Sequence, residues 1–219
     1  METLADSRPR QLPLDFGVPL PELRAPPKPW ARPKPRAEVR SGNLLFLGLV
    51  PDLSTRGAIV DCAMGLGERH RLTGRFRPAE LLHLTLFGVL GSEETIPDYL
   101  ISALEAVMGR VAAPTFELTL DRAMSFGSGE KKPFVLSCQT APPALLALRQ
   151  ALMDEVRNLF PRLGRSSFRP HVTLLYDKRQ VAEADLPRPI RWPVRDFVLV
   201  HSFQGQSRHD HLARWPLRG

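Results

Sequence analysis

The distribution of hydrophobic and polar positions divides the chain into an unpatterned start and a patterned remainder. Residues 43–51 (NLLFLGLVP) form a short apolar run that ends in proline, which is typical of a buried strand. Similar runs and alternations predict further strands at 81–90, 116–124, 133–139, 171–177, 190–194, 196–203 and 211–217. Apolar residues spaced three and four apart predict helices at 53–70, 97–109 and 143–159.

The order of these elements predicts the fold class. Strands and helices are mixed, with several connections of hairpin length instead of strict alternation. This order favours an α+β fold with mostly antiparallel sheet over a doubly wound parallel sheet. The glycine-bearing segment GLGERH at 65–70 lacks the glycine spacing of a phosphate-binding loop, so it does not support the alternative.

Residues 1–41 show no such patterning. Nine of the 22 prolines fall within residues 1–36, and residues 1–40 carry eight Lys and Arg against five Asp and Glu. Prolines at this density exclude a helix or a central strand. We therefore predict an irregular, basic, proline-rich arm at 1–41, acting as a linker or as a strap over the folded domain, and a single two-lobed domain at 42–219.

Composition limits the functional class. A chain of 219 residues that is 43% hydrophobic can bury a core without disulfides or metal. Cys62 and Cys138 are expected to be buried, reduced thiols. The sequence has no run of 18 apolar residues and no signal-peptide pattern, so we expect a cytoplasmic protein without a membrane partner. The net charge of +7 favours a polyanionic partner.

An internal repeat carries the candidate chemistry. The segment 83–87 (HLTLF) recurs as 171–175 (HVTLL), and a Phe-Arg-Pro triplet precedes each copy, at 76–78 and 168–170. In a strand, residues i and i+2 project from the same face, so each copy presents an imidazole beside a hydroxyl while the leucines and the valine enter a core. Because the pattern occurs twice, it indicates a duplicated functional element rather than two isolated core histidines.

Two opposed imidazoles can act as a general acid and a general base. We predict His83 and His171 as these catalytic residues, each with a pKa near the ordinary histidine value. The hydroxyls of Thr85 and Thr173 can donate to phosphoryl oxygens and stabilise charge as it develops. Neither a metal nor another cofactor is required by this scheme.

The paired motifs resemble those of the 2H phosphoesterase superfamily, and in particular its LigT-like branch of RNA 2′,3′-cyclic phosphodiesterases, also called the 2′-5′ RNA ligase family. The resemblance covers about residues 43–217. It implies a two-lobed fold with pseudo-twofold symmetry around a central groove. It also implies hydrolysis of an RNA-terminal 2′,3′-cyclic phosphate to a 2′-phosphate, with reverse 2′-5′ ligation as a possible side activity. The implied partners are RNA 3′ ends or cyclic nucleotides; we expect a monomer whose arm adds RNA affinity.

The sequence also departs from this family. Relatives frequently carry Arg five positions after the second histidine, where this chain has Tyr176. Arg169, Lys131 or Lys132 could supply the missing cation, or the site could prefer another phosphodiester. Phe126, in a loop rich in glycine and serine, is the candidate for stacking on a terminal base.

Weaker signals leave other readings open. His209-Asp210-His211 is insufficient for a closed metal site, and we expect it to be solvated. His201 either orients a catalytic histidine or has a structural role. The rival function is a non-catalytic nucleotide or single-stranded RNA binding module. ATP-dependent ligation is disfavoured because the chain shows neither a nucleophilic lysine motif nor the metal-binding carboxylates that it would need.

Overall fold

A computed structural model describes residues 42–161, 163 and 167–218, so the predicted arm at 1–41 lies outside the described residues. The strands of the described part are β1 (Gly42–Leu49), β2 (Leu84–Ser92), β3 (Phe116–Ser125), β4 (Lys132–Ser137), β5 (His171–Asp177), β6 (Ala184–Val194), β7 (Asp196–Gln204) and β8 (Arg208–Pro216). Its helices are α1 (Leu53–His70), α2 (Asp98–Met108), α3 (Pro143–Leu159) and the short 3-10 helix η1 (Ala79–Leu81).

Three predicted strands begin several residues away from the observed start. β8 begins at Arg208 and not at 211, because it pairs with β7 up to the short turn that joins the two strands. β6 begins at Ala184, six residues before the predicted start, and includes Pro187 and Pro189. It tolerates them because it lies at the edge of the sheet, where missing N–H donors leave no partner unsatisfied. The predicted strand at 81–90 instead opens on η1, so His83 directly precedes β2.

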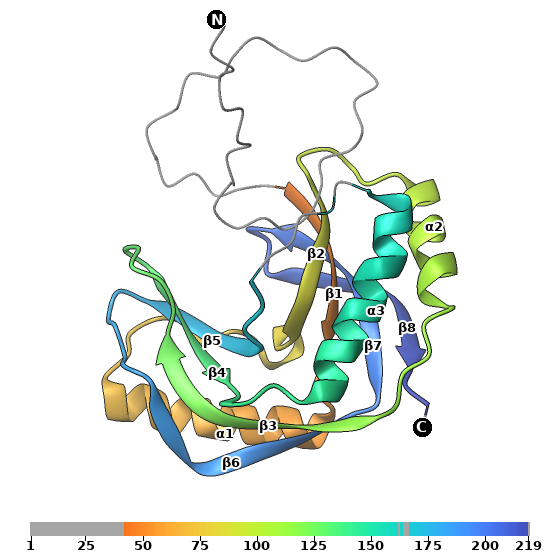
Figure 1. The fold of residues 1–219 in the computed structure, drawn as a ribbon. Helices are drawn as coiled ribbons and strands as arrows, with labels where there is room; N and C mark the ends of the chain where they lie inside the picture. The colour runs from red at the N-terminus through yellow and green to blue at the C-terminus, as the bar shows by residue number, and fades with distance from the viewer. Residues whose placement is uncertain (1–41, 162, 164–166, 219) are drawn as a thin grey trace, which may run out of the picture.

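The strands form one sheet in the order β6-β3-β4-β5-β2-β1-β7-β8, and neighbouring strands are antiparallel. β2 and β5 meet near the centre of the molecule (Figure 1) and are joined by the single residue pair Leu84 and Val172. Four strands lie on each side of this junction. The predicted α+β class and two-lobed antiparallel arrangement are therefore confirmed.

The two lobes share a local irregularity. Where β1 pairs with β2, Leu86 has no partner residue on β1 and forms a β-bulge. Where β4 pairs with β5, Leu174 has no partner residue on β4 and forms a second bulge. Each bulge falls three residues after the histidine of its motif. Both bulged carbonyls accept a hydrogen bond from an arginine, Leu86 from Arg149 Nε at 3.0 Å and Leu174 from the backbone N–H of Arg77 at 2.7 Å. The two copies of the motif therefore share the position of a β-bulge as well as their sequence pattern.

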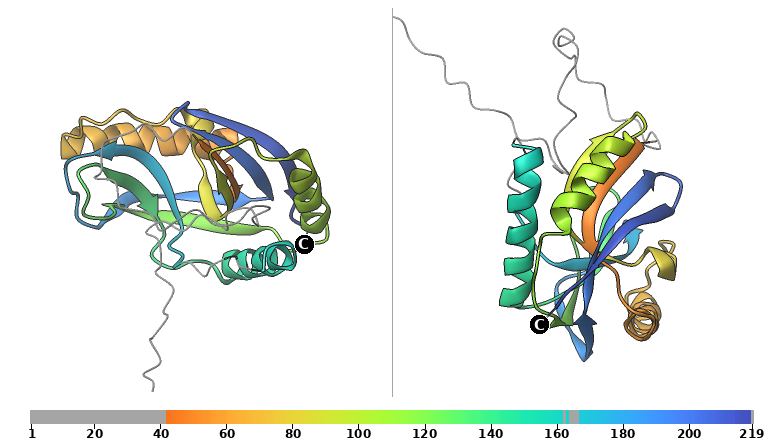
Figure 2. Two further views of the ribbon diagram at one scale, coloured as in Figure 1. Left: turned by 90° about the horizontal axis from the view of Figure 1, so that it is seen from above. Right: turned by 90° about the vertical axis from the view of Figure 1, so that its right-hand side faces the viewer.

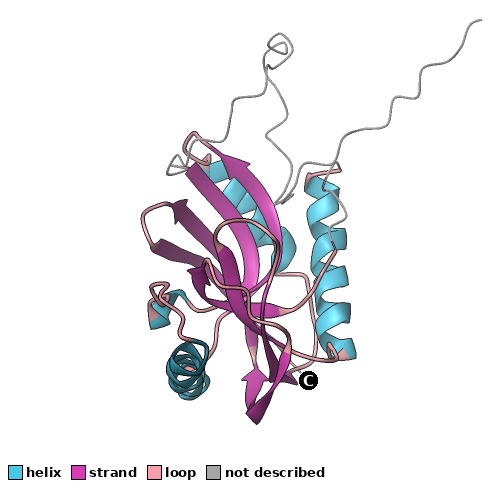
Figure 3. Ribbon diagram, turned by 90° about the vertical axis from the view of Figure 1, so that its left-hand side faces the viewer, coloured by secondary structure: helices cyan, strands magenta, loops and turns pink. Residues whose placement is uncertain are grey.

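The helices cover the strands from two sides. Figures 2 and 3 show α1 on one side and the neighbouring α2 and α3 on the other. α1 starts at an Asp52 cap, whose carboxylate accepts from the Thr55 N–H at 2.7 Å, and α3 starts with proline in its first turn. One continuous apolar core includes fully buried side chains from both lobes, among them Leu45, Leu84, Leu136, Leu152, Val172 and Phe197. Burial of each contributes about 1.5–3 kcal/mol.

The structure also describes both cysteines. Both cysteines are free thiols, but only Cys138 is buried; Cys62 is half-buried on α1, so the prediction of two buried thiols is half wrong.

Within the described ranges, no helix has the length and hydrophobicity to span a bilayer.

Candidate active site

The β2–β5 junction brings the two motifs together. Leu84 and Val172 are directly opposite each other and fully buried, so both side chains enter the core. Their neighbours in the strands point to the opposite face, because side chains alternate along a strand. The two histidines and two threonines of the motifs therefore share that face, and all four are half-buried. We refer to it as the site face.

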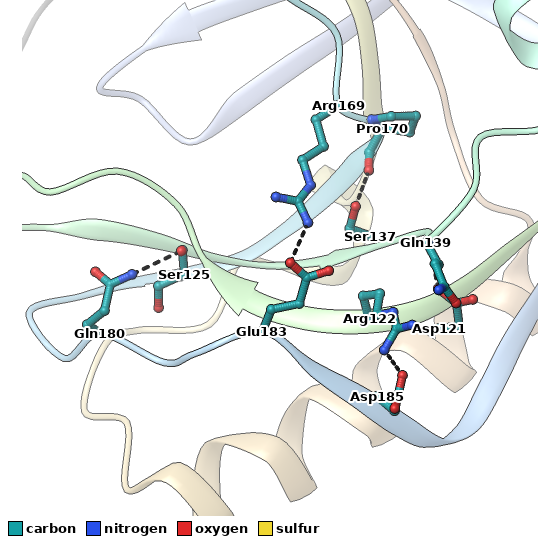
Figure 4. A network of polar contacts seen from close by, with 10 residues as sticks. All are labelled: Asp121, Arg122, Ser125, Ser137, Gln139, Arg169, Pro170, Gln180, Glu183 and Asp185. Atoms are coloured by element: carbon teal, nitrogen blue, oxygen red, sulfur yellow. Dashed lines mark hydrogen bonds and ion pairs between the residues drawn. The ribbon is translucent and has the colours of Figure 1, made fainter.

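Both motif histidines are oriented in the same way. Nδ1 of His83 lies 2.7 Å from the carbonyl oxygen of Leu81, and Nδ1 of His171 lies 2.7 Å from that of Arg169. A carbonyl can only accept, so each Nδ1 must carry the proton and each Nε2 keeps its lone pair. Ser137 steadies the second motif, because its hydroxyl donates to the carbonyl of Pro170 at 2.7 Å (Figure 4).

The expectation of ordinary pKa values for these histidines is wrong. Burial lowers the pKa of His83 to about 3, and the positive charges of His209, Arg77 and His171 act in the same direction. Burial also lowers the pKa of His171, helped by the charge of Arg169. Both imidazoles are therefore neutral at pH 7 while no anion is bound. An anion at the site would raise both pKa values by favouring the charged form.

The threonines of the motifs are available to a ligand. Thr85 lies opposite Gly48 of β1, and Thr173 lies opposite Val135 of β4. Within residues 42–161, 163 and 167–218, neither hydroxyl has a hydrogen-bond partner. Each can therefore donate to an anionic oxygen without breaking an existing bond.

An aromatic ring supports each histidine. The Phe46 ring lies 4.8 Å from the His83 ring, and the Phe126 ring lies 5.0 Å from the His171 ring, measured between centroids. Gly48 makes room for the first contact, because a Cβ there would come within 3.1 Å of the Phe46 ring and 2.9 Å of the Leu84 carbonyl oxygen. The sequence analysis singled out Phe126 but missed Phe46, because the unbroken apolar run of β1 hides which of its residues face the core.

The predicted cations lie in different places. Arg169 binds Glu183 at 2.9 Å, as Figure 4 shows, and its guanidinium lies 5.2 Å from the Phe126 ring centre. Lys132 donates to the carbonyl of Lys178 at the far end of β4, whereas His171 pairs with Ser137 at the near end. Lys131 is exposed in the turn before β4. The structure thus brings Arg169 to the second motif and leaves both lysines away from it.

Two residues that the sequence analysis did not assign to the site lie beside His83. The His209 ring is 5.0 Å from the His83 ring and 5.6 Å from Phe46, so the expectation of a solvated His209 is wrong. Arg77 lowers the pKa of both His83 and His209 by its charge, and its Nε is buried without a hydrogen-bond partner in the described part of the chain. The repeated Phe-Arg-Pro triplet was the signal that could have identified Arg77.

The structure decides between the alternative roles considered for His201 and for the segment 209–211. His201 is bonded through Nε2 to the Asn43 side chain at 2.8 Å and pairs with Leu45, a core position, so it orients neither motif histidine. Asp210 pairs with His201 on the face opposite the site face and is bound to Arg208. It therefore does not converge with its neighbouring histidines, and the described residues contain no cluster of three or more potential metal ligands.

Fold and site together define a two-lobed α+β protein in which each lobe contributes one histidine and one threonine to a common face. The model of the 2′-5′ RNA ligase superfamily matches residues 63–206. An RNA 2′,3′-cyclic phosphodiesterase of Escherichia coli K12 is 32% identical over 152 residues, which cover 66% of this chain and 80% of that protein. The chain therefore belongs to the 2′-5′ RNA ligase superfamily.

Solved structures agree with this assignment. E. coli LigT complexed with NADP+ matches with a TM-score of 0.66 and 25% identity over 81% of this chain and 99% of LigT. The same protein complexed with 3′-AMP matches with a TM-score of 0.62 and 26% identity over the same shares.

Proposed function

We propose that this chain is a phosphoesterase that hydrolyses RNA-terminal 2′,3′-cyclic phosphates to 2′-phosphates by acid–base catalysis between His83 and His171. The supporting observation is the shared orientation of the two rings, whose Nδ1 atoms are both fixed by backbone carbonyls. Both Nε2 atoms are thereby left free to exchange protons with a ligand. The family membership and the activity named for the E. coli relative support the same reaction class.

The proposed reaction needs one proton taken and one proton given. Nε2 of one histidine takes a proton from water as the water oxygen bonds to phosphorus. The bond between phosphorus and O3′ breaks, and the other histidine, protonated at Nε2, gives its proton to O3′. The product carries a 2′-phosphate and a 3′-hydroxyl, and the two histidines have exchanged protonation states. The scheme uses no group that the chain itself does not supply.

The lowered pKa values of His83 and His171 imply that the substrate itself promotes protonation of the general acid. With both imidazoles neutral, the general acid lacks its proton until an anion binds. The phosphate charge favours the imidazolium, so substrate binding and protonation of one histidine are coupled. Thr85 and Thr173 would then donate to the two non-bridging oxygens, where negative charge increases in the transition state.

The terminal base has a candidate platform in Phe126. Its ring contacts His171 edge to face and is half-buried at the end of the β3–β4 hairpin. The backbone N–H of Phe126 donates to the Pro133 carbonyl at 2.9 Å, which fixes the base of this loop. A nucleobase stacked there would place its ribose phosphate next to the second motif.

The test is identification of the product. The protein is incubated in EDTA with an RNA that ends in a 2′,3′-cyclic phosphate, and the product isomer is determined by phosphorus NMR. We expect only the 2′-phosphate. A 3′-phosphate product would require the opposite bond to break, and tight binding without turnover would establish the non-catalytic binding module instead.

A further inference from the structure

Basic side chains form a row along the edge strand β8. His209 pairs with Ser202, His211 with Val200, and Arg214 with Val198, all in β7. Residues directly opposite each other in an antiparallel pair project from the same face. Val200 also lies opposite Phe46, whose ring supports His83. The row therefore lies on the site face.

The near end of the row touches the active site. His209 contacts His83 ring to ring, and the buried, unpartnered Nε of Arg77 lies within the same group of charges. The strand order β5-β2-β1-β7-β8 places this row on the side of His83 that is away from His171. A chain bound between the two histidines would continue along the row without crossing the site.

The far end of the row reaches a cavity of about 610 Å³ between the start of α1 and the β6–β7 turn. Its lining includes Arg56, Arg195 and Arg214. Partial burial of the ring lowers the pKa of His211, and the charges of Arg214 and Arg56 act in the same direction. Arg56 has a buried Nε without a partner among the described residues, and its Nη2 donates only to the Pro51 carbonyl at 3.3 Å.

Two carboxylates also line this cavity, and both are engaged. Asp52 accepts from the Thr55 N–H as the cap of α1, and Asp196 binds Arg214 at 2.6 Å. Arg214 is thereby neutralised. Arg56 and Arg195 form no ion pair with either carboxylate in the described structure, so the cavity keeps positive charge.

We propose that Arg77, His209, His211 and Arg56 form a track that binds backbone phosphates of an RNA strand on the 5′ side of the reacting terminus. The active site would then select RNA ends over cyclic mononucleotides, which are too short to reach the cavity. This inference rests on the proposed function and specifies its substrate class. The physical basis is the series of cationic and hydrogen-donating groups, which neutralises a phosphate backbone without reading its sequence.

The test compares two substrates that share the same reacting group. Steady-state kinetics are measured on a five-nucleotide RNA ending in a 2′,3′-cyclic phosphate and on 2′,3′-cyclic AMP, at several salt concentrations. The variants are Arg56→Gln, His211→Gln and His211→Lys, and the matched control is Arg110→Gln, an exposed arginine bound to Glu155 of α3 on the helical side. His211 is exposed, so its variants keep the fold even if Arg56→Gln does not.

We expect Arg56→Gln and His211→Gln to raise KM for the RNA by about tenfold and to affect the cyclic mononucleotide much less. The slope of log KM against log salt should fall by about one in Arg56→Gln, which loses a charged phosphate contact. His211→Lys should lower KM for the RNA, and Arg110→Gln should behave as the unaltered protein. Equal changes on both substrates, or no change on either, would overturn the track.

A failure of the proposed function is distinguishable from a failure of the track. If the unaltered protein hydrolyses neither substrate, the proposed function is wrong, and the track is tested by fluorescence anisotropy with the same RNA. Weaker binding by His211→Gln, tighter binding by His211→Lys and no change in Arg110→Gln would still support it. Identical affinity in all variants would refute it.

Discussion

Leu84 and Val172 form the one residue pair through which β2 and β5 are joined, and each immediately follows a motif histidine. The positions of the two imidazoles relative to each other are therefore set by two fully buried side chains. The catalytic geometry and the packing of the core are coupled at this point, although neither side chain is on the site face.

Leu84→Ala is expected to cost stability and also turnover. Removing a fully buried leucine side chain destabilises a protein by about 2–5 kcal/mol. Because the cavity would form at the junction, we expect an additional fall in kcat at temperatures well below the melting point. The matched variant Leu118→Ala, which removes a fully buried leucine from β3, should cost comparable stability. If kcat falls equally in both variants, the junction has no special role.

The pKa of His83 predicts an acid-sensitive fold. That pKa is about 3 in the folded protein and ordinarily 6.5, so between these values the unfolded chain binds more protons. Stability must then fall as the pH is lowered from about 6.5 towards 3. Denaturant unfolding of the unaltered protein and of His83→Gln at pH 7.5 and 5 tests this, and the variant should lose less. Equal losses would show that His83 has an ordinary pKa in the folded state.

Substrate binding is expected to take up a proton. An anion beside His83 and His171 favours the imidazolium, so one of the depressed pKa values must rise in the complex. Calorimetric titration with a 2′-phosphorylated product, in buffers that differ in ionisation enthalpy, measures this uptake at pH 7. Binding without net proton uptake would contradict the coupling between the phosphate and the histidines.

The threonines should matter less than the histidines. Thr85→Ala and Thr173→Ala each remove one donor to a phosphoryl oxygen and leave proton transfer intact, and such a loss costs at most about 10²–10³ in kcat. Thr119→Ala, on β3, is the matched control. The measurement is kcat on the cyclic-phosphate RNA. A threonine variant slower than either histidine variant would contradict the assigned roles.

Phe126 is expected to contribute to KM. Phe126→Ala removes the ring beside His171 and should raise KM for the RNA by roughly tenfold, the usual scale for loss of one stacked base. Phe203→Ala is the control, because that ring is also covered by an arginine in a hairpin but lies at the β7–β8 turn. An unchanged KM in Phe126→Ala would leave the ring as a support for His171 only.

The duplication made much of this site predictable. The repeat identified the four motif residues, and strand periodicity placed each histidine and threonine on one face. α1 and α3 were predicted with the boundaries that the structure has, because their starts and ends carry local signals such as Pro143 and Pro161. These features depend on residues close together in the sequence.

Contacts between distant segments could not be predicted from the sequence. His209 reaches His83 only because β7 and β8 fold back beside β1, and nothing near residue 209 encodes that return. The pKa of His83 could not be predicted for the same reason, since burial and the charges of Arg77 and His209 come from other elements. The early start of β6 could not be predicted, because only the tertiary fold shows that this strand lies at an edge, where prolines are tolerated.

The central claim is that His83 and His171 act together as one acid–base pair, and single-turnover kinetics on the cyclic-phosphate RNA test it most directly. We expect His83→Ala and His171→Ala each to slow the chemical step by about 10²–10⁴, with the double variant little slower than either one. If one single variant keeps near-normal turnover, or if the two losses multiply in the double variant, the paired mechanism is contradicted.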